Sequence, residues 1–142
     1  MPGKYIVSGP IDPTEAIQQV SDDSAGGIAV FIGTVRNINE GKRVRGLTYE
    51  VYGPMAEKNM GEIEAEVRKR WPVKKIRLVH RQGKLSVGEV SVVVAVSCEH
   101  RGEAFEACRY AIDRIKEKLP LWKQESDAGG RTRWVAGRPI ES

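Results

Sequence analysis

The chain has 142 residues, of which 40% are hydrophobic and 30% charged, and this composition suits one globular domain over residues 1–142. No apolar run approaches the roughly 20 residues that span a bilayer, and no secretory signal pattern is present, so we expect neither a membrane protein nor a secreted one. The formal charge of +4 favours an anionic partner, and a content of 2 cysteines suits a reducing compartment such as the cytoplasm.

The first half of the chain alternates short strands and helices. Asp12, Pro13 and Glu15 form a helix-start pattern, so a helix is expected to run to about residue 20. The other expected elements are strands at residues 5–7, 28–35 and 47–52, an exposed loop at 37–45, and a helix after Gly53-Pro54 that ends at Pro72. The apolar stripe of that helix consists of Ala56, Met60, Ile63, Val67 and Trp71.

The second half contains a run of β-branched residues at 90–97, which predicts a buried strand. A strand at 76–80 and a connection at 83–88 precede it; a turn at 98–102, a helix ending at Pro120, a turn at 127–130 and a strand at 132–135 follow it. The helix carries its apolar stripe on Phe105, Cys108, Ile112, Ile115 and Leu119. This order predicts an α+β fold with a mixed or mostly antiparallel sheet.

The turn at 98–102 is the first candidate for chemistry, because it leads from a buried strand into a helix. The free N–H groups of a helix N-terminus attract anions, and His100 and Arg101 add further donors. We therefore expect the rest of the chain to build a pocket around this segment. On the pair alone, however, a solvated turn is the commoner outcome.

Three further basic residues are candidates. Lys116 falls at the edge of the apolar stripe, where a lysine usually extends its amine to solvent; in a partly desolvated pocket its pKa would fall and it would serve as acid, base or nucleophile. Lys123 lies just past Pro120, where exposure is the default. Arg36 ends a buried strand, and a plain strand-end charge and a site residue are equally compatible with that position.

Two other patterns point to no site. The basic cluster Lys42, Arg43 and Arg45 belongs to a solvated loop, and it lacks the interleaved aromatic residues that stack on bases, so nucleic-acid binding is the weaker interpretation. Cys98 and His100 are only two potential metal ligands, with no second cluster, so we expect no metal. Cys108 is expected in the core.

Several segments occur in the order and spacing of one family. They are residues 31–37, 68–72, 79–83, 97–101, 104–107, 120–125 and 133–135. The ordered set covers nearly the whole chain and resembles the large, catalytic subunit of molybdopterin synthase, the MoaE family. The resemblance implies an α/β-hammerhead-like mixed sheet with an added antiparallel subdomain.

The resemblance also implies an activity and partners. Family members transfer sulfur to cyclic pyranopterin monophosphate and so form the dithiolene of molybdopterin, a step of molybdenum cofactor biosynthesis. The sulfur arrives as a thiocarboxylate on the Gly-Gly C-terminus of a small ubiquitin-like subunit. Two large subunits form a central dimer with a small subunit at each end, which makes a heterotetramer. No cofactor, metal, membrane or nucleic acid is implied.

Residue by residue, the resemblance implies that Lys116 and Lys123 are catalytic, with Lys116 as the main electrostatic and proton-transfer group. The implied substrate-binding set is Thr34, Val35, Arg36, His100, Arg101, Lys116, Lys123, Gln124, Glu125 and Arg138. Arg138 would reach the pocket from the neighbouring large subunit. This chain departs from the family at Ile38, where a histidine is common, and at Cys98, where the residue is usually small.

A second hypothesis is a non-catalytic module that binds an anionic metabolite or an acidic protein. Such a module would need the basic loop, His100 and Arg101, but would have no use for two lysines in one pocket. Lysines that face the same cavity as Arg36 would therefore favour the enzyme, whereas lysines on separate solvated faces would favour the module.

Overall fold

The computed structural model describes residues 5–39, 41–126 and 132–135. Within that part the chain forms two four-stranded sheets, a two-stranded hairpin and three helices. The elements are β1 (Ile6–Val7), α1 (Pro13–Val20), β2 (Gly27–Thr34), β3 (Ile38–Asn39), β4 (Lys42–Arg43), β5 (Gly46–Val51), α2 (Gly53–Arg70), β6 (Val73–Arg81), β7 (Gly83–Ser86), β8 (Val90–Cys98), α3 (Arg101–Lys118), β9 (Leu121–Ser126) and β10 (Thr132–Val135). The predicted α+β class is confirmed.

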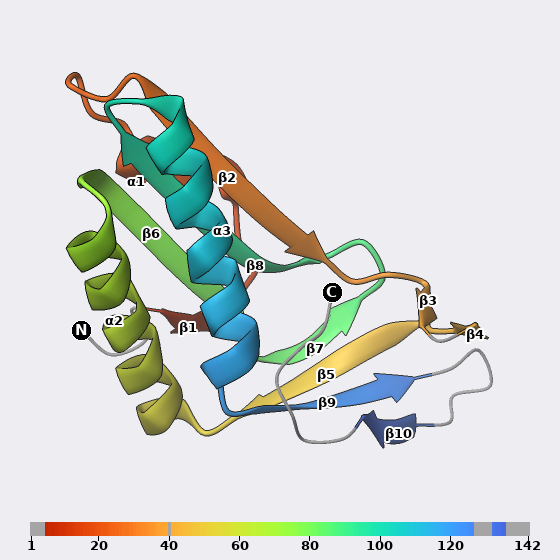
Figure 1. The fold of residues 1–142 in the computed structure, drawn as a ribbon. Helices are drawn as coiled ribbons and strands as arrows, with labels where there is room; N and C mark the ends of the chain where they lie inside the picture. Colours follow the sequence, from red (N-terminus) through yellow and green to blue (C-terminus); the bar gives the residue numbers. More distant parts are fainter. Residues whose placement is uncertain (1–4, 40, 127–131, 136–142) are drawn as a thin grey trace.

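The first sheet has the strand order β1-β6-β8-β2 and is covered on both faces (Figure 1). Strand β1 pairs with β6 in parallel, and the other pairs are antiparallel. Helices α2 and α3 pack on one face and α1 on the other. Because β8 is covered on both sides, its residues are buried without alternation, which explains its unbroken valine-rich sequence.

The second sheet has the order β10-β9-β5-β7 and is antiparallel throughout. It extends from one end of the first sheet, where β2 leads into β3 and β7 leads into β8 (Figure 1). In β5 and β9 the buried positions alternate with more exposed ones, so Leu47, Tyr49, Leu121 and Glu125 share the inner face.

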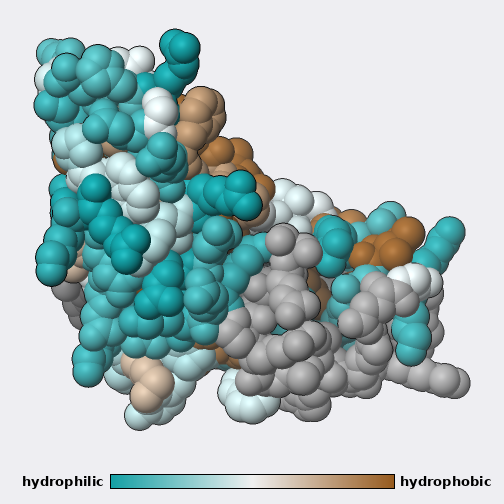
Figure 2. Space-filling view, viewed as in Figure 1, coloured by the Kyte–Doolittle hydropathy of each residue, from teal (hydrophilic) through white to brown (hydrophobic). Residues whose placement is uncertain are grey.

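Strand β2 is an edge of the first sheet, since β8 is its only neighbour in the described sheets. Two of its side chains, Ile28 and Ile32, are 40% and 43% exposed. Hydrophobic surface gathers along this strand in Figure 2. The first sheet therefore leaves an apolar edge open.

The helix starts follow the sequence closely. The Asp12 side chain accepts a hydrogen bond from the Thr14 N–H and caps α1, as predicted. The predicted stripe of α2 is buried at Ala56, Met60, Ile63 and Val67. None of the helices in the described ranges has the length and apolarity needed to cross a membrane.

Several predictions of local structure are wrong. The loop at 37–45 contains the hairpin β3–β4, and the connection at 83–88 contains β7; no element was predicted after Pro120, where the structure has β9. Gly53 and Pro54 are not a break but the first turn of α2, where a proline needs no hydrogen-bond donor. The predicted turn at 127–130 lies outside the described residues.

The stripe predicted for α3 needs one correction. Phe105 is 65% exposed, and small residues fill its expected place in the core. The face of α3 toward the sheet is made by Ala104, Ala107, Cys108, Ala111, Ile112 and Ile115. The alanines allow α3 to lie close to β2 and β8, and Phe105 is left on the outer side.

Candidate active site

A cavity of about 200 Å³ lies where the two sheets and α3 meet. Strands β2, β6 and β8 form one side, β5 and β9 another, and the C-terminal half of α3 a third. Its lining consists of Phe31, Ile32, Gly33, Thr34, Arg36, Tyr49, His80, Ser91, Val92, Ile112, Ile115, Lys116 and Lys123. The charged side chains among these residues, Arg36, Lys116 and Lys123, are all basic.

Three separate elements bring these cations together. Arg36 follows β2, whose pairing with β8 shifts register between Gly33 and Thr34. Lys116 lies in the last turn of α3. Lys123 pairs with Tyr49 across the β5–β9 ladder and so projects to the inner face of the second sheet. A single chain therefore brings these three residues to one cavity, as the family resemblance implied.

Gly33, in the cavity wall, leaves room for the side chain of Val92. A Cβ atom built there would lie 2.6 Å from Cγ1 of Val92 and 3.3 Å from the Phe31 ring. A contact of 2.6 Å is shorter than real Cβ atoms make, so a side chain at this position would force the Val92 side chain to move.

The environment of Lys116 lowers the pKa of its amine. Partial burial lowers the pKa of the Lys116 amine, the positive charges of Lys123 and Arg36 lower it further, and the carboxylate of Asp113 acts in the opposite sense. The Lys116 Nζ atom also lies 5.9 Å from the centroid of the Phe31 ring. A lysine with a lowered pKa and cationic neighbours is suited to binding anions and to exchanging protons.

A chain of side-chain contacts holds Arg36. Its Nη2 atom donates to Oδ1 of Asn39 at 3.4 Å, and Nδ2 of Asn39 donates to Oε2 of Glu125. Glu125 is buried and does not line the cavity, so it supports the arginine only through Asn39. Strand alternation sends Gln124 to the opposite face of β9.

The backbone near Arg36 is mostly engaged within the protein. The Val35 N–H donates to the carbonyl of Glu89 at 3.0 Å, and the Val35 carbonyl accepts from the Gly88 N–H at 2.8 Å. The Val35 side chain is buried. Thr34, by contrast, lines the cavity.

His100 and Arg101 lie at the other end of α3. Fifteen residues separate Arg101 from Lys116 on one helix, which corresponds to about 22 Å along the axis. The side chain of His100 is 75% exposed, and its Nε2 atom lies 3.3 Å from Oε1 of Glu99. Within one chain this pair does not line the cavity, so the pocket is not built around the turn as expected. Arg138 lies outside the described residues.

Several lining residues were not predicted as site residues. Tyr49 is buried, and burial raises the pKa of its hydroxyl. Ser91 donates to the Gly33 carbonyl at 3.2 Å. His80 is fully buried in β6, which lowers the pKa of its ring to about 4. Nothing in a strand pattern separates such residues from ordinary core positions, although residues 79–83 belong to the segments that carried the family resemblance.

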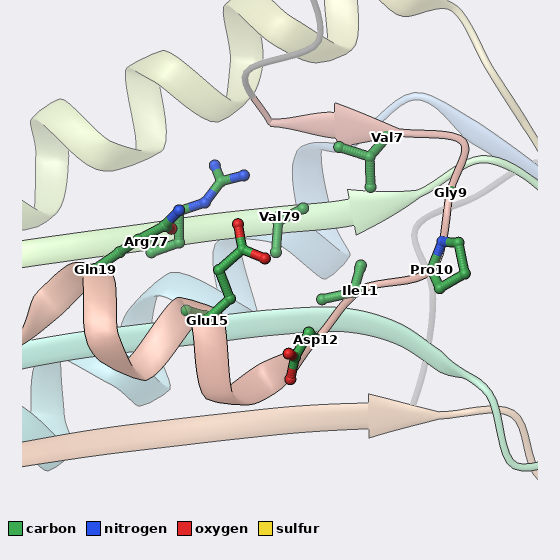
Figure 3. A pocket seen from close by; sticks show the side chains of 10 residues that line it. Val7, Gly9, Pro10, Ile11, Asp12, Glu15, Gln19, Arg77 and Val79 are labelled. Atoms are coloured by element: carbon green, nitrogen blue, oxygen red, sulfur yellow. The ribbon is translucent and has the colours of Figure 1, made fainter.

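A second cavity, of about 150 Å³, lies between α1 and strands β1 and β6 (Figure 3). It is lined by both acidic and basic side chains: Asp12, Glu15 and Arg77. Asp12 already caps α1, and Nη1 of Arg77 donates to the carbonyl of Leu78. The mixed charge contrasts with the uniformly basic lining of the first cavity.

The described ranges contain no candidate metal site. Residues 5–39, 41–126 and 132–135 contain no group of three or more His, Cys, Asp or Glu side chains that would hold an ion. Cys98 and Cys108 are buried free thiols, and burial raises the pKa of both. Neither thiol is therefore prepared to act as a nucleophile.

Comparison with known proteins points to one family. Residues 6–118 match the family described as MoaE protein. The chain is 46% identical over 130 residues to the molybdopterin synthase catalytic subunit of Halalkalibacterium halodurans (92% of this chain, 83% of the relative) and 45% identical over 123 residues to that of Pyrococcus abyssi (87% and 82%).

Two solved structures share the fold. The structure of molybdopterin synthase from Staphylococcus aureus superposes with a TM-score of 0.87 at 37% identity and covers 96% of this chain and 98% of its own. A complex of subunits 1 and 2 of the molybdopterin-converting factor from Helicobacter pylori gives a TM-score of 0.77 at 19% identity, with 95% and 91% covered. These similarities confirm the predicted fold.

The lowered pKa of Lys116 leads to a prediction about its neighbours. Replacing Lys123 with glutamine removes a positive charge that disfavours the Lys116 ammonium form, so the pKa of Lys116 should rise toward its ordinary value of 10.5. The titration can be followed by NMR on protein whose lysines carry ¹³C-methyl groups, with Lys116→Arg identifying the signal. Lys58→Gln, on the exposed side of α2, serves as the control and should leave the Lys116 titration unchanged. An unshifted Lys116 in Lys123→Gln would contradict the coupling.

Proposed function

The chain belongs to the MoaE protein family, and we propose that it acts as the catalytic subunit of a molybdopterin synthase. In this proposal it is a sulfurtransferase. It moves sulfur from the thiocarboxylated C-terminus of a small ubiquitin-like subunit to cyclic pyranopterin monophosphate, which becomes the dithiolene of molybdopterin. The reaction belongs to molybdenum cofactor biosynthesis, in the cytoplasm.

The observation that carries the proposal is the convergence of Arg36, Lys116 and Lys123 on one cavity. A module that only binds an acidic partner needs exposed cations and gains nothing from a lysine that is partly desolvated. Partial burial instead prepares Lys116 for chemistry, because it lowers the cost of giving up its proton. The enzyme is therefore favoured over the binding module.

The residue types suit sulfur transfer. A thiocarboxylate is an anion, and its reaction develops negative charge on oxygen or sulfur. Preorganised cations stabilise such charge best in a site that excludes water. Lys116, which has the lowered pKa, is assigned to proton transfer as well as charge stabilisation, while Lys123 and Arg36 bind and polarise. No metal or cofactor is required by this scheme.

A small subunit is the expected sulfur donor. The Helicobacter pylori structure is a complex of subunits 1 and 2 of the molybdopterin-converting factor, and it shares this fold. A Gly-Gly terminus has no side chains, so it can enter a narrow space such as the cavity of about 200 Å³. Once the tail is inserted, its terminal group would meet the three cations.

The cavity is smaller than the roughly 300–1,000 Å³ of a typical ligand site, which suggests that a second copy of the chain completes it. Strand β2 supplies an open edge with exposed Ile28 and Ile32. Its start, at Gly27, lies against Arg101, and its end, at Thr34, lines the cavity. Antiparallel pairing of two β2 strands about a two-fold axis would bring the start of one strand beside the end of the other.

Such a dimer would bring the remaining predicted site residues to a cavity in the neighbouring copy. The second copy's His100 and Arg101 would approach the cavity of the first copy and add donors for the substrate phosphate. Arg138 is proposed to act in the same way, from the neighbouring subunit. Gln124 and Glu125 stay in the proposed substrate-binding set, Glu125 through its support of Asn39 and Arg36.

Reconstitution tests the function directly. Purified chain, thiocarboxylated small subunit and cyclic pyranopterin monophosphate should yield molybdopterin, detected as its fluorescent oxidation product. The matched control is the same small subunit with an ordinary C-terminal carboxylate, which should give no product. Product formation that does not depend on the thiocarboxylate, or no product despite a complex with the small subunit, would refute the sulfur-transfer proposal.

Lys116→Ala should lower turnover at least about 100-fold, because it removes both charge stabilisation and the proton-transferring amine. The lysine lies at the edge of the core, so the thermal unfolding temperature should change little. Lys69→Ala, on an exposed part of α2, is the control and should keep full activity. A Lys116→Ala protein that turns over normally would remove this residue from the mechanism.

Co-expression of two inactive variants tests the shared site. If a site takes Lys116 from one chain and Arg101 from the other, a mixed dimer of Lys116→Ala and Arg101→Ala contains one intact site. Random pairing then restores about a quarter of the unmodified activity. Lys116→Ala with Lys123→Ala should restore none, since both residues line the cavity of the same chain. Equal results for the two pairs would disprove the sharing.

A further inference from the structure

His80 is a buried polar residue on the cavity wall that the proposed chemistry does not use. Its side chain is 0% exposed, and it lines the cavity together with Tyr49 and Ser91. The Tyr49 and His80 rings pack edge to face, with centroids 5.2 Å apart and planes at 86°. The ring is therefore held in one orientation by its neighbours.

One hydrogen bond fixes the tautomer of this ring. The Nδ1 atom lies 2.7 Å from the carbonyl oxygen of Arg81, and a carbonyl only accepts, so Nδ1 carries the proton. Burial lowers the pKa of the ring to about 4, so the imidazole is neutral at pH 7. Its Nε2 atom then has a lone pair and no proton, which makes it purely an acceptor.

That acceptor has no hydrogen-bond partner within the described residues, and it is shielded from solvent. Buried polar atoms are nearly always paired, so an unpaired one in a native structure calls for an explanation, and a donor supplied by a ligand in the cavity is one. The charged groups around the cavity, Arg36, Lys116 and Lys123, are suited to anions. Nε2 is suited to the opposite kind of group, a neutral N–H or O–H donor.

We propose that His80 Nε2 accepts a hydrogen bond from the ring system of the substrate and thereby selects for a heterocycle that carries a donor at that position. The inference rests on the proposed function, since a reduced pterin carries ring N–H and amino groups. The cavity then has two kinds of recognition. The cations hold the anionic groups of the substrate and of the incoming tail, and His80 determines how the ring is oriented.

The histidine content makes a direct measurement practical, because the chain has only 2 histidines. In ¹⁵N-histidine-labelled protein, His100→Gln identifies the two ring signals. His80 should show a protonated Nδ1 and an unprotonated Nε2 in the free protein. Saturation with cyclic pyranopterin monophosphate should move the His80 Nε2 resonance to the value of a hydrogen-bonded nitrogen.

Kinetics of two variants separate recognition from packing. His80→Phe keeps an aromatic ring against Tyr49 but removes the acceptor, so KM should rise roughly 10- to 100-fold with little change in kcat. His80→Gln places an amide oxygen near the position of Nε2 and should recover part of that loss. A purely structural role would not make the polar variant the better one.

The outcomes distinguish this inference from the proposed function. Substrate that binds and turns over without moving the Nε2 signal would overturn the inference alone, as would a free protein whose His80 carries its proton on Nε2. Absence of both binding and turnover in the unmodified chain would overturn the proposed function and this inference with it. Should His80→Phe fail to fold, the NMR measurement on the unmodified chain still decides.

Discussion

The whole arrangement depends on the burial of β8 on both faces and along both edges. Val92, Val94 and Val96 face α2 and α3, while Val93 and Ala95 face α1. The backbone pairs with β2 on one side and β6 on the other. Full burial of each valine contributes about 1.5–3 kcal/mol, so this strand is the part of the fold that is hardest to displace. The cavity is built at one end of this fixed strand, and its walls take their positions from it.

The cation cluster is unfavourable for Lys116 in the empty protein, because the positive charges of Lys123 and Arg36 disfavour its ammonium form. Two features offset that repulsion. Lys116 is in the last turn of α3, where the negative end of the helix dipole stabilises a cation. Arg36 is linked through Asn39 to the buried carboxylate of Glu125. A bound anion would relieve the remaining repulsion, so the site is prepared for a negative ligand before it arrives.

The sequence predicts the helices, the central strand and the basic residue types of the site, because these depend on local periodicity and on caps such as Asp12. The sequence does not predict the positions of residues that depend on pairing between distant strands. From the local sequence alone Lys123 would be exposed, because Pro120 ends a helix, and only the family resemblance placed it in the site; in the structure β9 begins at Leu121 and pairs with β5, which turns Lys123 inward. His80 was overlooked because a histidine at a strand end carries no sign of being buried and unpaired. The separation of Arg101 from Lys116 already follows from the predicted helix that ends at Pro120, and the expectation of one pocket around the turn overlooked it.

That separation limits what one chain can do. The 18 residues of α3 form a rigid rod, so no local rearrangement brings Arg101 to the cavity at the other end of the helix. The eight residues of β2 extend about 26 Å, close to the roughly 22 Å between Arg101 and Lys116 along α3. In the proposed two-fold pairing, the start of β2 in one copy would lie beside the end of β2 in the other, so the strand length nearly matches the distance that divides the two groups of basic residues. The open apolar edge and the divided set of cations thus have one explanation, because the same pairing that buries Ile28 and Ile32 would also complete the anion-binding site.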